Sequence, residues 1–212
     1  MLISDIITLV DDQTDEIYDN GEWVTLINQC LDDLTPIAKM INTYDSIAIT
    51  VASKRASIAI ASDTNLPNVH EIVNLYYTPN GGKETRLKRL VLNDSYSKGW
   101  KLDSGKIYLQ GLGTEVTGTV RVDAYKKLTH IVYVASPESY TPTSPDLPEQ
   151  YHGLIVSYLC AKCQQREEEP SDKQDFWNDY MTEKQNFTID RIKQMEPWKL
   201  KNLQAQTSSK SK

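Results

Sequence analysis

The segment that decides the fold runs from Leu147 to Met195 and reads LPEQYHGLIVSYLCAKCQQREEEPSDKQDFWNDYMTEKQNFTIDRIKQM. Apolar side chains recur in it at three- and four-residue spacing on both sides of an acidic, proline-containing turn, which predicts two amphipathic helices. Each helix has one face that must be covered by the rest of the chain or by a neighbouring subunit. The apolar positions are Tyr151, Leu154, Ile155, Tyr158 and Leu159 in the first helix, and Phe176, Trp177, Tyr180, Met181, Phe187, Ile192 and Met195 in the second.

Further helices are expected at the beginning of the chain. A short first helix spans about residues 4–10, and a second opens at Asn20 or Gly21, where small and polar side chains suit a helix start. The second helix ends or bends at Pro36, because proline fits the first turn of a helix better than its interior. Another turn or two, residues 37–41, completes a helical N-terminal section.

From Ser46 the apolar period changes to two, which is typical of β-strands. Short strands follow one another up to Tyr125, separated by turn residues such as those at 79–82. The sequence therefore predicts an α+β fold, with a helical bundle formed by the N- and C-terminal helices and an inserted antiparallel β-sandwich or open β-barrel. The expected boundaries are 1–44 and 148–196 for the helical domain, 45–135 for the β domain, 136–147 for an extended proline-rich linker, and 197–212 for a flexible basic tail.

Composition excludes some classes of protein. The chain has 212 residues and a mean hydropathy of -0.50, and it contains no apolar run near the ~20 residues that a spanning helix needs. We therefore expect no contact with a membrane. The N-terminus lacks the basic and long apolar regions of a signal peptide, and three cysteines are an odd number for a disulfide framework. These features indicate synthesis in a reducing cytoplasm.

The net charge of -6 is unevenly distributed. Every charged side chain before Lys39 is acidic, and after Pro197 the charged side chains are all lysines. One interpretation is a solvated helical face followed by a frayed tail. The other is that the two ends of the chain meet surfaces of opposite charge.

No motif of catalysis or of metal binding is found. Cys160 and Cys163 form a CxxC pair, but it lies within an amphipathic helix and lacks the further ligands that a structural zinc needs, so buried helix cysteines are the simpler interpretation. The three histidines are scattered, and no glycine-rich phosphate loop is present. Consecutive acids such as Asp32 and Asp33 diverge by roughly 100° on a helix and cannot easily share a substrate. The sequence thus predicts neither an enzyme nor a cofactor.

Nucleic-acid binding is the alternative function. Residues 83–106 contain seven Lys and Arg against three Asp and Glu, and Tyr96 and Trp100 lie among them. Such a stretch could follow a phosphate backbone and stack on bases. An exposed hairpin would have the same composition, and the pI of the whole chain is near 5.1.

Three blocks resemble the head–tail connector (adaptor) proteins of tailed bacteriophages, in the branch that has a β insertion between helical ends. The first is the tryptophan-led helix Glu22–Leu31, and the second is the Leu-Pro strand entry of Leu66–Tyr76. The third, Asp146–Tyr158, is the most characteristic, and an aromatic helix around Phe176–Tyr180 follows it. In this order the blocks span most of the chain.

The resemblance implies a structural virion protein without catalysis. It implies a ring, usually of twelve copies, that docks beneath the portal protein after DNA packaging and offers its other face to the next tail component. DNA would pass through the ring without sequence-specific binding, at the head–tail junction of the virion. The C-terminal segment would reach the portal, which makes Trp198, Lys199, Lys201, Lys210 and Lys212 the candidate portal-binding residues. Asp11, Asp12 and Asp15 would line the channel, repelling DNA, or meet a basic neighbouring subunit.

Overall fold

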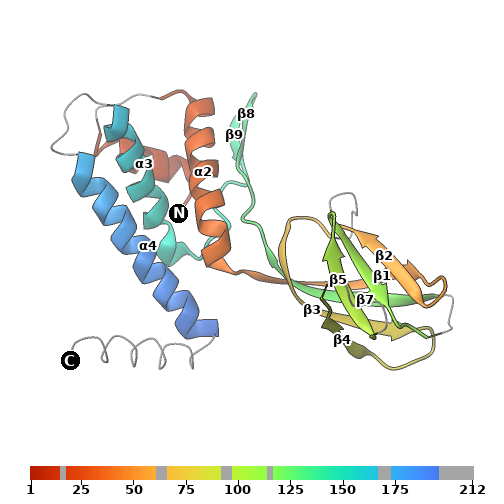
Figure 1. Cartoon of the computed structure of the whole chain (residues 1–212). Coiled ribbons are helices and arrows are strands. Elements are labelled where there is room, and N and C mark those ends of the chain that lie inside the picture. The colour runs from red at the N-terminus through yellow and green to blue at the C-terminus, as the bar shows by residue number, and fades with distance from the viewer. Residues whose placement is uncertain (15–17, 61–65, 92–96, 114–116, 167–172, 196–212) are drawn as a thin grey trace, which may run out of the picture. The chain divides into compact units, whose positions relative to one another are not determined.

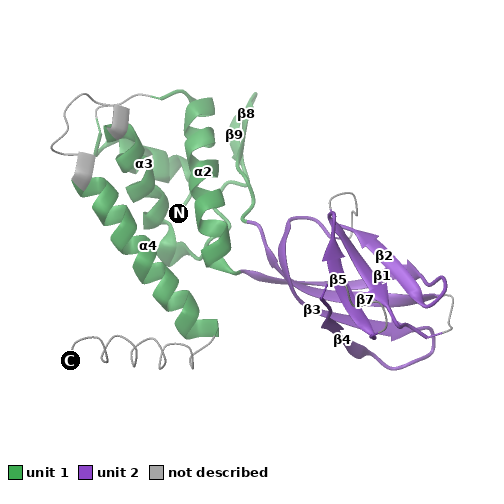
Figure 2. Cartoon of the chain, viewed as in Figure 1, with its two compact units in different colours: residues 1–39, 128–212 green, residues 40–127 purple. Residues whose placement is uncertain are grey.

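The computed structural model describes residues 1–14, 18–60, 66–91, 97–113, 117–166 and 173–195 (Figure 1). The chain divides into two compact units (Figure 2). The helical unit consists of residues 1–39 and 128–212, and the β unit consists of residues 40–127. The fold is α+β, and the described residues form four α-helices and one nearly closed, barrel-like sheet.

The helical unit contains all four α-helices and a short hairpin. Helix α3 contacts α1, α2 and α4, and α2 also contacts α4, so residues from both ends of the sequence lie side by side. The bounds are α1 Ile3–Asp11, α2 Asn20–Ala38, η1 Glu149–Tyr151, α3 Gly153–Arg166 and α4 Lys173–Met195, with strands β8 Val132–Ala135 and β9 Glu138–Thr141.

Helix α2 begins and ends at identifiable signals. At its start, the Asp19 carboxylate accepts the backbone N–H of Glu22 at 2.8 Å, and the Glu22 carboxylate accepts the backbone N–H of Asp19 at 3.2 Å. This reciprocal arrangement satisfies two N–H groups that a helix start leaves unbonded. At its end, Lys39 adopts a left-handed conformation with φ of 45°. Arg191 of α4 then donates to the carbonyl oxygen of Ala38 at 2.7 Å, which satisfies a terminal acceptor.

The first of the two predicted effects of Pro36, an end of the helix, is wrong, because α2 continues through Pro36 to Ala38. The proline lies in the last turn, where few hydrogen bonds remain to be lost. The preceding residue is also held, since the Thr35 hydroxyl donates to Leu31 O at 2.9 Å and accepts the N–H of Leu128 at 3.1 Å. The helical turn expected over residues 37–41 is wrong beyond Ala38.

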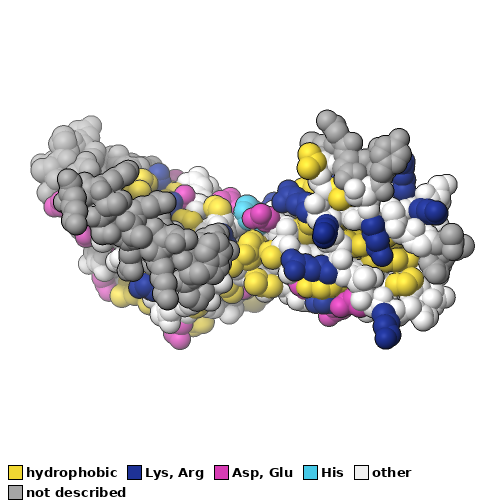
Figure 3. All heavy atoms as spheres, turned by 60° about the horizontal axis from the view of Figure 1, so that its bottom comes forward, with side chains coloured by type: hydrophobic (Ala, Val, Ile, Leu, Met, Phe, Trp, Pro, Cys, Tyr) yellow, Lys and Arg dark blue, Asp and Glu magenta, His cyan; other side chains and the backbone are white. Residues whose placement is uncertain are grey.

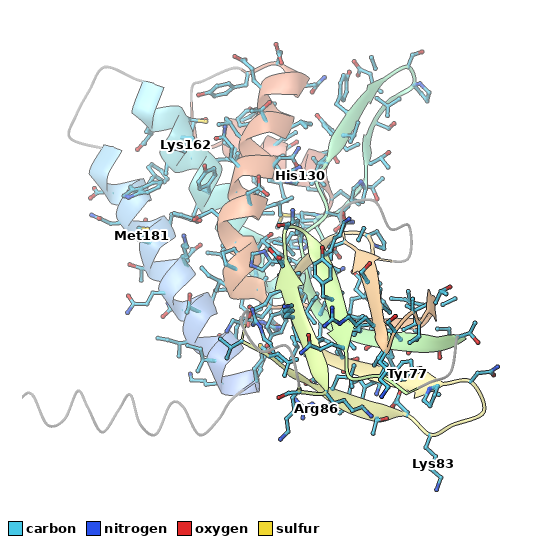
Figure 4. All side chains as sticks on the ribbon, turned by 45° about the vertical axis from the view of Figure 1, so that its right-hand side comes forward. Tyr77, Lys83, Arg86, His130, Lys162 and Met181 are labelled. Atoms are coloured by element: carbon cyan, nitrogen blue, oxygen red, sulfur yellow. The ribbon has the colours of Figure 1, made fainter. Side chains whose placement is uncertain are left out.

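The predicted apolar stripe of α3 is confirmed, whereas that of α4 is confirmed only in part. Leu154, Ile155 and Leu159 of α3 are buried, as are Tyr180 and Phe187 of α4. Phe176, Trp177, Ile192 and Met195 of α4 are half-buried. The Met181 side chain is 47% exposed and lies on the outer side of α4 (Figure 4).

The proline-rich segment differs from the expected extended linker. Strands β8 and β9 pair as an antiparallel hairpin, with Tyr133 opposite Tyr140 and their ring centroids 5.6 Å apart. The Tyr140 hydroxyl donates to the side chain of Asn20 at 2.7 Å, which ties the hairpin to the start of α2. Cross-strand aromatic pairing and this anchor stabilise a two-stranded element that would be marginal alone.

The β unit is a single seven-stranded sheet in the order β1-β7-β3-β4-β5-β6-β2. The terminal strands β1 and β2 contact each other, which nearly closes the sheet into a barrel. Alternate side chains point to its inner face and form the core, with Leu75, Val122 and Ile107 fully buried. The strand bounds are β1 Ile41–Thr50, β2 Arg55–Ala59, β3 Val69–Pro79, β4 Thr85–Arg89, β5 Gly99–Asp103, β6 Lys106–Gln110 and β7 Thr117–Lys126.

One strand pair departs from the predicted antiparallel sheet. Lys88 and Arg89 of β4 pair with Gly99 and Trp100 of β5 in parallel. Parallel neighbours need a crossover rather than a tight hairpin, and the segment between Arg89 and Gly99 is longer than a hairpin turn. The remaining pairs are antiparallel.

Candidate functional site

The predicted channel-lining acids lie at the end of α1. Asp11 is the last residue of that helix and Asp12 is its C-cap, and both side chains are exposed. Partial burial and the neighbouring charge of Asp12 raise the pKa of Asp11. Asp15 lies outside the described residues, as do the predicted portal-binding residues Trp198, Lys199, Lys201, Lys210 and Lys212.

The consecutive acids Asp32 and Asp33 do diverge, as the helical geometry predicts. The Asp32 carboxylate lies 2.9 Å from His130 Nε2, whereas Asp33 points toward α4. There the Tyr180 hydroxyl and the Lys184 ammonium both donate to Asp33 Oδ2, each at 2.5 Å. This three-residue cluster joins α2 to α4, and it was not predicted from the sequence.

Electrostatics in this cluster favour the ionised carboxylate. Burial opposes the charge on Asp33, but the hydrogen bonds from Lys184 and Tyr180 outweigh it and lower the pKa of Asp33. Burial raises the pKa of Tyr180, and the adjacent Cys30 and Asp33 raise it further. The phenol therefore stays protonated and remains a donor. The cluster thus has a structural role, because it holds α2 and α4 together.

The cysteines do not form a reactive centre. Cys30, Cys160 and Cys163 are free thiols, and all three are buried. Burial, with the neighbouring Cys163, raises the pKa of Cys160 to about 11, so the thiolate that reacts or binds metals is disfavoured. Among the described residues, no group of three or more His, Cys, Asp and Glu side chains is placed to hold a metal ion.

Several lysines lie on the outer face of the β unit. Lys88 is opposite Gly99, Lys101 is two residues further along β5, and Lys106 is opposite Asp103, another two residues along. Because alternate residues share a face, the three lysines form a diagonal row across β4, β5 and β6, and the Asp103 side chain lies on the same face, opposite Lys106. From one lysine to the next, the row moves across one strand spacing of ~4.8 Å and along two residues of ~3.3 Å each, which is about 8 Å. The row of three lysines is therefore about 16 Å long. We call it the lysine row.

Other charges on the β unit are arranged around the lysine row. Figure 3 shows Lys and Arg side chains spread over this unit, with few acidic side chains among them on the face in view. Arg86 precedes Lys88 by two residues on β4 and donates to the side chain of Asn74. Lys83 projects from the turn between β3 and β4 (Figure 4).

A different part of the outer face is neutralised internally. Arg121 lies 3.0 Å from the carboxylate of Glu84 and 3.2 Å from that of Asp123, and its guanidinium carbon is 3.8 Å from the centroid of the Tyr76 ring. Hydrogen bonding to Glu84 is the largest cause that raises the pKa of Arg121. This cation is therefore held in the sheet surface rather than offered to a partner.

The aromatic residues expected to stack on bases are not available for it. Trp100 is only 2% exposed and forms part of the core, with the Arg89 guanidinium 5.5 Å from its ring centroid. Tyr96 lies outside the described residues. The stretch 83–106 is thus basic but, in its described part, does not present Trp100 as a stacking platform.

The two units carry opposite net charge. The β unit, residues 40–127, contains twelve Lys and Arg and eight Asp and Glu, whereas the helical unit contains eleven and twenty-one. The lysine row could have been found from the sequence only with the strand register, because β4 and β5 were not predicted as separate strands. The overall charge of -6 conceals the basic unit.

None of the helices in the described part of the chain has the length and apolar character that crossing a membrane requires. The sequence profile of the family described as SU10 adaptor protein matches residues 1–202. No curated protein matches the chain.

Proposed function

Because this chain belongs to the SU10 adaptor protein family, a family of bacteriophage head–tail adaptors, we propose that it forms a ring beneath the portal protein of the virion. The ring contains twelve copies, extends the DNA channel, and joins the capsid vertex to the next tail component. The family match over residues 1–202 carries this proposal. The chain acts as a structural protein, without catalysis or a cofactor.

The helical unit and the β unit have different roles in this proposal. The N- and C-terminal helices act as one bundle, since α2 contacts both α3 and α4 and Asp33 binds Tyr180 and Lys184. The inserted β unit supplies a second body, with a hydrophobic core of its own, for contacts within the ring. Two bodies in one subunit suit an adaptor, because each can hold a different neighbour.

Portal docking is assigned to the basic tail. The lysines after Pro197 have no acidic residue among them, and Trp198 provides a large apolar contact of the kind common at interfaces. A tail that is ordered on the portal loses conformational entropy, which its contacts must offset. Residues 197–212 are therefore assigned to the portal contact, with Trp198 as the anchor.

Asp11 and Asp12 are assigned to the wall of the channel. Both are exposed at the end of α1, and a ring of such carboxylates repels the DNA phosphates, so that DNA passes without adhering. Replacing Asp11, Asp12 and Asp15 with asparagine should slow DNA ejection or change DNA retention. Unchanged ejection and retention would move these residues to the interface between subunits or to solvent.

The docking proposal is tested with the purified chain and the portal of the same virion. Full-length protein should bind the portal, and a variant truncated after Glu196 should not. A variant with Trp198→Ala should bind more weakly than one with Lys212→Gln, which is the matched control at the far end of the tail. Portal binding that survives the truncation would place the contact elsewhere on the chain.

A further inference from the structure

One end of the barrel-like sheet holds a pocket of about 440 Å³. It lies within the β unit, where β2, β4 and β7 end and where β3 and β6 begin. The mouths of β-barrels are frequent places for ligand sites, and pockets of about 300–1,000 Å³ are typical of such sites. We call it the mouth pocket.

The floor of the mouth pocket is apolar and continuous with the core of the β unit. Ile72 and Trp100 belong to that core, and Ile60 and Val69 pack against it. Leu102 is 40% exposed and extends the apolar lining toward solvent. An apolar side chain that enters the pocket would therefore contact existing core residues and leave water, which is favourable.

A β-bulge shapes one wall of the mouth pocket. The register of β3 against β7 shifts between Val69 and Glu71, which makes His70 an extra residue on β3. In a regular strand only alternate side chains share a face, whereas the four successive residues 69–72 all line this pocket. Bulges re-aim side chains in this way, and they are over-represented at the rims of barrels and beside active sites.

Two cations lie at the rim of the mouth pocket and are available to a ligand. Arg89 and Lys127 are both exposed, and neither forms an ion pair with a carboxylate of a described residue. The Arg89 guanidinium carbon is 5.5 Å from the centroid of the Trp100 ring, which holds this cation over the floor. A contact with a ring leaves guanidinium N–H groups free to donate to an anion. Among the described residues of the lining, Glu71 is the acid, so the rim is positive on balance.

We infer that the mouth pocket binds an acidic peptide segment of another protein. An apolar side chain of the segment enters against Trp100 and Leu102, and a neighbouring carboxylate pairs with Arg89 and Lys127. Extended segments are commonly recognised in this way, by a pocket for a side chain and by a cation for an acidic group. The pocket lies within the β unit of one copy, so this binding goes beyond the proposed ring and does not require it.

An acidic peptide fits the mouth pocket better than nucleic acid does. A phosphate backbone is followed by cations in succession, whereas this rim holds Glu71 beside its two cations. Single strands also stack their bases on aromatic rings, and Trp100 is only 2% exposed. A peptide supplies what both parts of the pocket require, which is an apolar group for the floor and a carboxylate for the rim.

Fluorescence polarisation with the full-length chain and labelled peptides measures the binding. The probes are four peptides in which a leucine, methionine, phenylalanine or tryptophan lies between two aspartates. At least one of them should bind, and replacing its apolar residue with serine, or its aspartates with lysine, should weaken binding about tenfold. If none of the four binds at millimolar protein concentration, the inference is overturned.

Two variants of the chain locate the contact. Arg89→Glu together with Lys127→Glu should weaken binding about tenfold, because two exposed ion pairs become repulsive contacts. Leu102→Gln keeps the charge and should weaken binding about threefold. If the double reversal lowers the thermal unfolding midpoint, Arg89→Gln with Lys127→Gln replaces it, and a threefold weakening is expected.

The matched control carries Lys54→Glu and Lys83→Glu, which change the net charge by the same amount as the double reversal. Both lysines are exposed, and they lie in turns at the other ends of β2 and β4. The control should bind the peptide as the wild type does. Equal loss in the control and in the double reversal would overturn the inference, because the peptide would then respond only to overall charge.

Other occupants of the pocket give different results, and each overturns the inference. If duplex or single-stranded DNA binds the wild type and displaces the peptide, and the double reversal abolishes this, the pocket is a nucleic-acid site. If sedimentation velocity shows that the wild type self-associates and the double reversal does not, the occupant is a second copy. Portal docking, which is assigned to residues 197–212, should be unchanged in both pocket variants, so failure here leaves the proposed adaptor function standing.

Discussion

Replacing Tyr180 with phenylalanine isolates one hydrogen bond in the contact between α2 and α4. Tyr180 is fully buried, and its ring lies 5.2 Å from that of Tyr158 and 5.5 Å from that of Trp177, so phenylalanine keeps the ring contacts. Only the hydroxyl that donates to Asp33 is removed. A hydrogen bond to a charged group contributes about 1.5–3 kcal/mol. Because Asp33 keeps Lys184 and is partly open to water, we expect a loss of about 1.5 kcal/mol.

The expected loss depends on pH in a defined direction. The pKa of Asp33 is lower in the folded state than its ordinary value of about 3.9. Its contribution to stability is therefore fully present above about pH 4, and it is lost as the pH falls through the folded-state pKa. The difference between wild type and Tyr180→Phe should be largest near neutral pH and should shrink below about pH 4.

Urea unfolding followed by circular dichroism at 222 nm measures this loss, because the signal comes mainly from the helical unit. The matched control is Tyr133→Phe, which also removes a hydroxyl that donates to a carboxylate, that of Glu138 at 2.9 Å, but on the exposed hairpin. The control should change the free energy of unfolding by less than about 0.5 kcal/mol. Equal effects of the two changes, or none from Tyr180→Phe, would refute the role of the cluster.

Three further changes test the packing of each unit. Leu159→Ala, at a fully buried position of α3, should destabilise the helical unit by about 2–5 kcal/mol in the same urea experiment. Gly118→Ala would place a Cβ 2.5 Å from the Tyr77 ring, so it should cost the β unit about 1–3 kcal/mol and speed amide exchange in β7. Arg191→Met removes the donor to Ala38 O, at a cost of about 1 kcal/mol, and should speed amide exchange at the end of α2. If amide exchange in the Gly118→Ala and Arg191→Met variants is as slow as in the wild type, the expectations for these two variants are contradicted.

Much of the architecture could be predicted because it depends on local periodicity. Ile155 and Phe187 of the predicted stripes are buried, and the change of period near Ser46 falls within β1, which begins earlier, at Ile41. Met181 was expected in the core and is exposed. It follows Tyr180 directly, so the two side chains are about 100° apart on the helix and only one of them faces α2.

The remaining features depend on contacts between distant residues. Pro36 stays in α2 because Thr35 binds Leu128 and because the helix ends soon afterwards, and neither fact is local to the proline. The lysine row depends on the parallel pairing of β4 with β5, which places Lys88 and Lys101 on neighbouring strands. Strand register across a crossover connection cannot be read from spacing alone.

The central claim is that this chain closes into a ring on the portal, and cryo-electron microscopy of the two purified proteins mixed together tests it most directly. The account predicts a closed ring of twelve copies beneath the portal, with a continuous channel through both. Portal particles that carry no added density, or that carry isolated copies without neighbours, would contradict it.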